Sequence, residues 1–210
     1  MSIVGVDACR AGWVAVTLGG GVHVHATFDS VIASAQPDAV IGVDMPIGLV
    51  ERGARAADLE VRRFLAHRRA SLFIMPPRPV VTARSYRDAC RRSERTTGKR
   101  ISLQAWHLFP KLREVDRHAA DPRILEVHPE TSFALMAGAP LAERKHTPTG
   151  RALRRSLLAA HGIAIDGDHD TLDAAAAAWS ARRWLAGTAR RFPAEPRDVD
   201  RSGRAICIVA

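Results

Sequence analysis

The chain has 210 residues, 47% of them hydrophobic and 25% charged, which is ordinary for a soluble globular protein. Its three cysteines include no CxxC pair, which argues against a disulfide framework and against a zinc ribbon. No apolar stretch approaches the roughly 20 residues of a membrane span, and Asp7 comes too early for the apolar part of a secretory signal. We therefore expect a soluble, cytoplasmic protein without a membrane partner.

The excess positive charge is confined to one part of the chain. Residues 51–100 contain 14 Arg or Lys and 5 Asp or Glu, a difference of +9, whereas the other 160 residues contain 17 of each sign. Such a block favours a polyanionic partner, because each phosphate that it neutralises releases condensed counterions. The alternative is an arginine-rich helical surface that is only solvated. Charge alone does not decide between the two.

The first part of the chain predicts three strands, a helix and a further strand. Apolar, β-rich runs at 3–9 and 12–18 lead through three glycines into a third short strand at 22–26. A short helix is expected at 29–36. The continuous apolar run 39–43 predicts an interior strand that is covered on both faces.

The basic part is predicted to be helical. Apolar residues recur at helical spacing from Ala57 to Leu65, and the arginines lie mostly off this stripe. The proline-rich run 76–79 is expected to break regular structure. Helices follow at about 84–95 and 102–118, the second interrupted by Pro110. We interpret residues 51–118 as a basic helical insertion within a single domain that spans residues 1–210.

The rest of the chain predicts a strand at 123–128 and a helix that Pro129 opens and Gly138 closes. Two more helices are expected at 149–161 and at about 171–186, and a last strand at 205–209. The predicted fold is therefore α/β, with a mixed sheet of five or six strands flanked by helices.

Two aspartates close almost identical strand motifs. Asp7 ends the run VGVD, and Asp44 ends the run IGVD. A carboxylate after several apolar strand residues lies at the mouth of an α/β sheet, where such sheets place their ligands. Two of them on neighbouring strands repel each other unless a cation lies between them, and all-oxygen ligation selects Mg²⁺ or Mn²⁺. The alternative is that each aspartate only caps the turn that follows it.

A late helix carries further candidate ligands. In the run DTLDAAAAAW, Asp170 and Asp173 are three residues apart and share one face of the first helical turn. The alanines leave little bulk, so we expect this helix to approach the sheet closely. The alternative is purely structural, because Asp170 as the N-cap and Asp173 three residues later make a stable helix start by themselves.

Glu126 and Glu130 flank His128 at the end of a predicted strand. Glu130 is a candidate ligand, or it only favours a helix N-terminus, and His128 is a functional histidine or a core or capping one. The sequence has no HExxH motif and no cysteine–histidine spacing, so a zinc hydrolase is not expected.

Five blocks of the sequence occur in a familiar order: VGVDACRAGWVAV, IGVDMPIGL, ARAADLEVRRFLAHR…PPR, LEVHPETSF and TLDAAAAAWSA. Together they resemble a domain-of-unknown-function family described as predicted nucleases with an RNase-H-like fold. The resemblance covers nearly the whole chain. It implies an RNase-H-like α/β fold and, from the family's motif, nuclease activity.

A more distant resemblance is to the bacterial Holliday-junction resolvase family. That family carries an Asp on its first strand, an acidic residue on a later apolar strand and a closing helix that begins D-x-x-D-A. By position, these residues match Asp7, Asp44, Asp170 and Asp173. The resolvases have Glu where this chain has Asp44, and the insertion before Arg123 is longer and far more basic here. Junction resolution is therefore not carried over.

The resulting hypothesis is hydrolysis of a phosphodiester by water activated between two Mg²⁺ or Mn²⁺ ions roughly 4 Å apart. Asp7 would bridge both ions, Asp44 and Asp173 would each hold one, and Asp170 or Glu130 would complete the shell. The predicted contacts to nucleic-acid phosphates are basic side chains: Arg62, Arg63, Arg68, Arg69, Arg78 and Lys145.

Two alternatives stay open. One is an ATP-dependent phosphotransferase of the actin-like fold, which also opens with an Asp-bearing hairpin but needs a second lobe and a second glycine-rich phosphate hairpin. The other is a non-catalytic nucleic-acid-binding module with the same fold. Metal-dependent turnover would distinguish this module from the enzyme.

Overall fold

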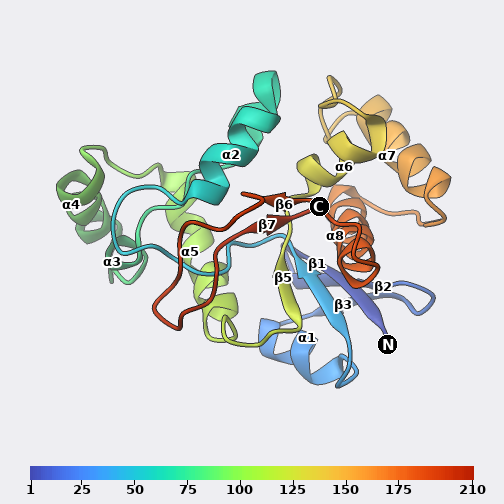
Figure 1. The fold of residues 1–210 in the computed structure, drawn as a ribbon, viewed down its shortest axis with the longest axis horizontal. Coiled ribbons are helices and arrows are strands. Elements are labelled where there is room, and N and C mark those ends of the chain that lie inside the picture. The colour runs from blue at the N-terminus through green and yellow to red at the C-terminus, as the bar shows by residue number, and fades with distance from the viewer.

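A five-stranded mixed sheet forms the centre of the computed structural model, which describes all 210 residues (Figure 1). Its strands are β1 (Ile3–Cys9), β2 (Gly12–Thr17), β3 (Gly21–His25), β4 (Val40–Val43) and β5 (Ile124–Glu126). They lie in the order β3-β2-β1-β4-β5, with β1 antiparallel to β2, β2 antiparallel to β3, and β4 parallel to both β1 and β5. The predicted α/β class and mixed sheet are confirmed, and the arrangement is compatible with an RNase-H-like fold.

The expected last strand is shorter than predicted and lies outside this sheet. Strand β7 (Ile208–Val209) pairs with β6 (Arg191–Phe192), which was not predicted, in a two-stranded ribbon. Val209 also forms a parallel bridge with Val127, just beyond β5. The main sheet therefore has five strands, the lower of the two numbers predicted, and the ribbon lies next to its β5 edge.

The repeated Gly-Val-Asp motif has a direct structural consequence. In the parallel pair β1–β4, Gly5 stands opposite Gly42. Because side chains alternate along a strand, Asp7 shares the face of Gly5, and Asp44 follows Gly42 on that same face. Each motif therefore provides a bare stretch of sheet followed by a carboxylate at the end of the strand.

Helix α8 (His169–Leu185) packs directly onto these glycines. A Cβ atom added to Gly5 would lie only 1.9 Å from the carbonyl oxygen of Ala174, and one added to Gly42 would lie 2.5 Å from that of Ala177. The run Ala174–Ala178 is buried throughout, and atoms of Ala174, Ala177 and Ala178 lie against the two glycines. This confirms the expectation that the alanine run lets the helix approach the sheet closely.

The other face of the sheet is covered by α1 (Phe28–Ser34) and α5 (Leu103–Asp116), which share the largest hydrophobic core with β1 and β4 (Figure 1). Helix α5 runs without a break through Pro110, so the predicted interruption there is wrong. Proline inside a helix removes one backbone hydrogen bond, and its ring crowds the carbonyl four residues earlier. The fully buried side chains of Phe109, Leu112 and Val115 hold the helix in place around it.

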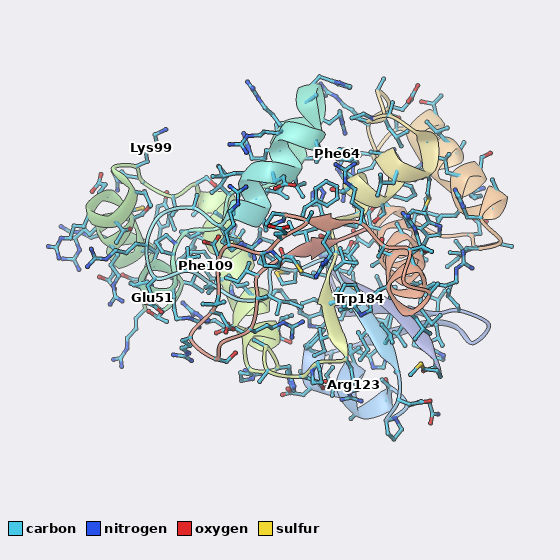
Figure 2. All side chains as sticks on the ribbon, viewed as in Figure 1. Glu51, Phe64, Lys99, Phe109, Arg123 and Trp184 are labelled. Carbon is cyan, nitrogen blue, oxygen red and sulfur yellow. The ribbon has the colours of Figure 1, made fainter.

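The chain between β4 and β5 is helical, as predicted. Its elements are α2 (Ala56–Phe64), the 3-10 helix η1 (Ala66–Ser71), α3 (Arg78–Val81), α4 (Tyr86–Thr97) and α5. The short helix α3 lies where the proline-rich run was expected to prevent regular structure. Pro79 occupies its first turn, where a missing N–H breaks no helical hydrogen bond. Figure 2 shows Lys99, after α4, at the far tip of this segment, away from Trp184 on α8.

Two further helices, α6 (Pro129–Ala137) and α7 (Pro148–Ala160), lie on the α8 side of the molecule (Figure 1). Gly138 ends α6 with a left-handed φ of 76°, as its position predicted. None of the helices combines the length and the apolar character that crossing a bilayer requires.

Candidate metal centre

Three aspartates from distant parts of the chain meet at one end of the sheet. Asp7 belongs to β1, Asp44 directly follows β4, and Asp173 lies in the first part of α8. One carboxylate oxygen of each lies within 4.8 Å of the others. Asp7 is 6% exposed and Asp173 is 1% exposed. The predicted convergence of these three carboxylates is confirmed, and we call them the aspartate triad.

Asp173 is free to join the triad because another residue caps α8. The N-cap is Asp168, whose Oδ1 accepts hydrogen bonds from the Thr171 backbone N–H at 2.9 Å and from its hydroxyl at 2.8 Å. The alternative in which Asp170 is the cap is therefore wrong. Asp173 Oδ2 accepts a hydrogen bond from Lys145 Nζ at 2.5 Å, whereas its Oδ1 is buried with no hydrogen-bond partner.

The electrostatics of the triad favour binding of a cation. Burial, followed by the charges of Asp44 and Asp173, raises the pKa of Asp7 well above its usual range. Burial and then Asp173 raise the pKa of Asp44 to about 8, and burial raises the pKa of Asp173. Burial by itself lowers the pKa of the Lys145 ammonium. The charge of Asp173 outweighs this effect, so that the pKa is raised overall. One ammonium cannot neutralise three carboxylates, so the triad has room for further positive charge.

The chemistry of the donors also fits a hard cation. The triad offers only carboxylate oxygens, which are the ligands that Mg²⁺ and Mn²⁺ prefer. The unpartnered Oδ1 of Asp173 is a second indication, because a buried anionic oxygen without a donor is costly. The residues present therefore fit a divalent cation of this class.

Two cavities meet at the triad. The first, of about 270 Å³, contains Asp7 and Asp44 and has an apolar wall. The second, of about 410 Å³, contains Asp44 and Asp173 and has a basic wall. We call them the apolar pocket and the basic groove. The residues that line both are Asp44, Ser71, Phe73, His128 and Lys145.

The other predicted carboxylates lie beside the triad rather than in it. Glu130 is buried and accepts a hydrogen bond from Arg154 at 2.6 Å, with Arg68 at 3.7 Å, and it lines the basic groove. Asp170 lines the apolar pocket, and its Oδ1 lies 3.3 Å from the ring of His169. Neither belongs to the three-oxygen cluster.

The predicted phosphate-binding residues fall into three places. Lys145 and Arg68 line the basic groove. A separate surface hollow on α2 and η1 is lined by Arg62, Arg63 and Arg69. The structure does not bring Arg78 to the site, because this side chain is only 6% exposed and donates to both carboxylate oxygens of Asp116, at 2.6 and 3.0 Å.

Several residues of the site were not predicted from the sequence. Ser71 lines both cavities, while His67, Arg144 and His146 line the groove. Among these residues, only Arg144 and His146 are neighbours in the sequence of a residue that was predicted, Lys145. Ser71 and His67 reach the groove because η1 folds back toward the triad, a long-range contact that no spacing in the sequence predicts.

A second buried cluster fixes the loop that follows Asp44. Arg55 donates to Glu126 Oε1 at 2.6 Å and to Oε2 at 2.8 Å, and it also pairs with Asp58. Glu126 Oε2 accepts a hydrogen bond from the Ile47 N–H at 2.7 Å. All three charged side chains are nearly inaccessible to solvent. Glu126 therefore supports the site by holding this loop.

We expect Arg55→Met to lower the free energy of unfolding by about 3–5 kcal/mol, because it leaves Asp58 and Glu126 buried without a compensating charge. Arg63→Met, on the exposed side of the same helix, should change it little. Urea denaturation of both variants measures the difference. Equal stability of the Arg55→Met protein and the parent would mean that this buried network is not formed.

His128 lies between the two cavities and is neutral at physiological pH. Burial lowers its pKa to about 4. The residue is the N-cap of α6, and its Nδ1 lies 3.1 Å from the Thr131 hydroxyl. His128 thus occupies the N-cap position, but its side chain makes no capping hydrogen bond to the backbone, and its ring borders both cavities.

Comparison with known proteins places this chain in a family. Residues 5–198 match the family described as "Protein of unknown function (DUF429)", and the matched range includes the whole aspartate triad. No curated protein and no solved structure matches the chain. The family description states no activity, so the nuclease activity stays a prediction. With nearly its whole length matched, the chain belongs to this family of proteins of unknown function.

Proposed function

We propose that the protein is a metal-dependent nuclease that hydrolyses phosphodiester bonds of nucleic acid. The observation that carries the proposal is the aspartate triad, in which three carboxylates meet and one buried oxygen of Asp173 has no partner. Carboxylates that repel one another in a largely water-excluded site are costly unless a cation binds them. Two cavities give a substrate access to this centre.

In this proposal the three carboxylates of Asp7, Asp44 and Asp173 would together hold the two divalent ions. Such ions supply the acidity that activates water and the charge that stabilises the phosphate during hydrolysis. Without a metal ion, the ammonium of Lys145 pairs with Asp173 and supplies part of the positive charge that the triad needs. Its flexible stem lets the ammonium turn to a substrate phosphate in the groove.

The basic side chains position the nucleic acid. Arg68 and Lys145 face the groove beside the triad, and the exposed arginines on α2 and η1 extend the positive surface. Contacts of this kind orient a phosphate backbone without reading its sequence. We therefore propose DNA or RNA as the substrate, bound with a strong dependence on salt concentration.

A phosphotransferase of the actin-like type is less well supported. The structure has one five-stranded sheet and a small two-stranded ribbon, and it offers no second lobe for a nucleotide to lie between. A non-catalytic nucleic-acid-binding module stays a candidate, since a basic surface serves binding and catalysis alike.

The test of the proposed function is a cleavage panel. Single-stranded, duplex and branched DNA and RNA are incubated with the protein in Mg²⁺, in Mn²⁺, in Ca²⁺ and in EDTA. We expect cleavage of at least one substrate in Mg²⁺ or Mn²⁺ and none in EDTA. Binding without cleavage in every metal would identify a binding module, and cleavage that persists in EDTA would contradict the metal-dependent mechanism.

The triad also predicts how stability depends on pH in EDTA. In the unfolded chain Asp44 ionises near pH 3.9, whereas in the folded protein its pKa is about 8. The folded state therefore binds more protons between these values, and stability falls as the pH rises through this window. Between pH 6.5 and 8, His128 is neutral in the folded protein and loses its remaining proton only in the unfolded chain, so its effect opposes that of Asp44 but is smaller.

Thermal unfolding in EDTA at pH 6.5 and at pH 8 measures this effect. We expect a lower melting temperature at pH 8, a smaller difference in the Asp44→Asn variant, and recovery of the melting temperature at pH 8 when Mg²⁺ is added. A melting temperature that rises with pH in EDTA and does not change when Mg²⁺ is added would contradict the proposed electrostatics of the aspartate triad.

A further inference from the structure

The basic groove contains most of the unsatisfied polar atoms of the protein. Five buried side-chain nitrogen or oxygen atoms have no hydrogen-bond partner, and three of them belong to residues that line this groove. They are Nε of Arg68, Oγ of Ser71 and Oδ1 of Asp173. Buried polar atoms are normally satisfied, so a group of them along one cavity indicates a polar ligand that completes their bonding. Arg68 and Ser71 offer donors, as a phosphate requires.

The apolar pocket differs in having an extended apolar part of its wall, formed by Phe73 and by the side chains of Met45, Leu72, Met75, Leu108, Val127 and Ile208. Beside the triad, the rest of its lining includes the paired charges of Arg55, Asp58 and Glu126. Phe73 also borders the groove and is 42% exposed, so its ring is available to a ligand at the junction. An exposed aromatic ring beside a positively charged groove is the usual platform on which an unpaired base stacks.

The triad is the boundary between these two cavities. Asp7 is reached from the pocket and Asp173 from the groove, while Asp44 and Lys145 border both. A ligand that spans the two cavities would therefore pass residues that line both, among them Asp44 of the triad and Lys145. Its apolar part and its anionic part would lie on opposite sides of the proposed metal centre.

We propose that the protein binds its substrate as an unpaired nucleotide, with the base in the apolar pocket, the scissile phosphate at the triad and the adjoining phosphate in the basic groove. This inference rests on the proposed nuclease function and names its substrate class: single-stranded nucleic acid or an unpaired end. Arg68 and Ser71 bind the adjoining phosphate, and Phe73 stacks on the base.

An intact duplex does not fit this arrangement. A paired base is stacked between its neighbours and has to leave the helix before it can enter a pocket. Duplexes should still bind weakly through the exposed arginines of α2 and η1.

The experiment measures binding in Ca²⁺ by fluorescence anisotropy, with a labelled single-stranded oligothymidine and a blunt duplex of equal length as probes. Arg68→Gln should weaken binding of the single strand by about tenfold and that of the duplex by much less. Arg69→Gln is the matched control, because its exposed side chain lies outside both cavities. It should weaken both probes slightly and equally.

Phe73→Ala should likewise weaken binding of the single strand by about tenfold and leave the duplex unchanged, as expected for loss of one stacked base. Ile74→Ala is its control, since Ile74 is 41% exposed and lines neither cavity. Phe73→Leu, which keeps apolar bulk without the ring, should match Phe73→Ala, and thermal unfolding verifies that each variant is folded.

The outcomes separate this inference from the proposed function. Equal affinity for the two probes, or single-strand binding that is insensitive to both Arg68→Gln and Phe73→Ala, would overturn the inference even if Mg²⁺-dependent cleavage is found. Selective single-strand binding that depends on both residues supports it. If no cleavage occurs in Mg²⁺, that selective binding remains and only the nuclease activity is refuted.

Discussion

Asp7→Asn should lower the rate of Mg²⁺-dependent cleavage by at least about a thousandfold, because it removes one of three carboxylate charges at the centre where the ions bind. The fold should be retained. Asp7 Oδ1 accepts a hydrogen bond from the Ala8 N–H at 2.7 Å, and the amide oxygen of asparagine can accept the same bond. The substitution also relieves repulsion within the triad, so the melting temperature in EDTA should rise.

Single-turnover cleavage rates of the parent and the variant measure this effect. Asp38→Asn is a suitable control, because Asp38 is exposed and precedes β4, at the opposite end of that strand from Asp44. Its rate should equal that of the parent. Asp170→Asn tests the predicted extra ligand, and we expect a smaller loss than for Asp7→Asn because Asp170 lies outside the cluster. A folded Asp7→Asn protein that cleaves as fast as the parent would refute the mechanism.

Gly5→Ala should lower the free energy of unfolding by at least about 3 kcal/mol, at the upper end of the usual cost of overpacking. The added Cβ would lie 1.9 Å from the carbonyl oxygen of Ala174 and 2.2 Å from the backbone nitrogen of Ala178. These are backbone atoms of α8 and cannot turn aside as a flexible side chain does. The helix would have to move away from the sheet, and Asp173 would move with it.

Urea denaturation tests this prediction, with Gly20→Ala as the control. Gly20 lies in an exposed turn, and the nearest atoms to a Cβ there belong to the Thr17 side chain rather than to backbone, so less stability should be lost. Gly42→Ala should resemble Gly5→Ala, since its Cβ would lie 2.5 Å from the carbonyl oxygen of Ala177. If Gly5→Ala were as stable as the parent, α8 would not lie directly on β1.

The triad could be predicted because its position follows from local periodicities. The period of two along a strand places each aspartate on the face of the preceding glycine, and the parallel pairing of β1 with β4 brings the two motifs together. The alanine run of α8 then indicates which helix can lie on those glycines. Residues close to Asp7, Asp44 and Asp173 thus indicate the strands, the face of the sheet and the helix that covers this face.

The surroundings of the triad could not be predicted in the same way. Arg68 and Arg69 are adjacent and chemically identical, yet only Arg68 lines the groove, because η1 presents them in different directions. Arg78 was expected at the substrate, but Asp116, far along the chain, binds its guanidinium. Such outcomes depend on how the helices between β4 and β5 pack, which spacing and charge leave undetermined.

Helix boundaries show the same limit on a smaller scale. Asp168 and Asp170 are both acceptable N-caps by residue type, and only the backbone geometry selects Asp168. At Pro110 the local rule favours a break, but the burial of Phe109 and Leu112 outweighs one lost hydrogen bond. Tertiary packing therefore decided both outcomes.

A divalent cation held by Asp7, Asp44 and Asp173 is the feature on which the proposed function depends. Anomalous diffraction from crystals soaked in Mn²⁺ locates such an ion directly. We expect at least one peak whose oxygen ligands, at about 2.1–2.2 Å, come from the aspartate triad, with Lys145 Nζ displaced from Asp173. Crystals saturated with Mn²⁺ that show no peak at the triad, and in which Lys145 still pairs with Asp173, would contradict it.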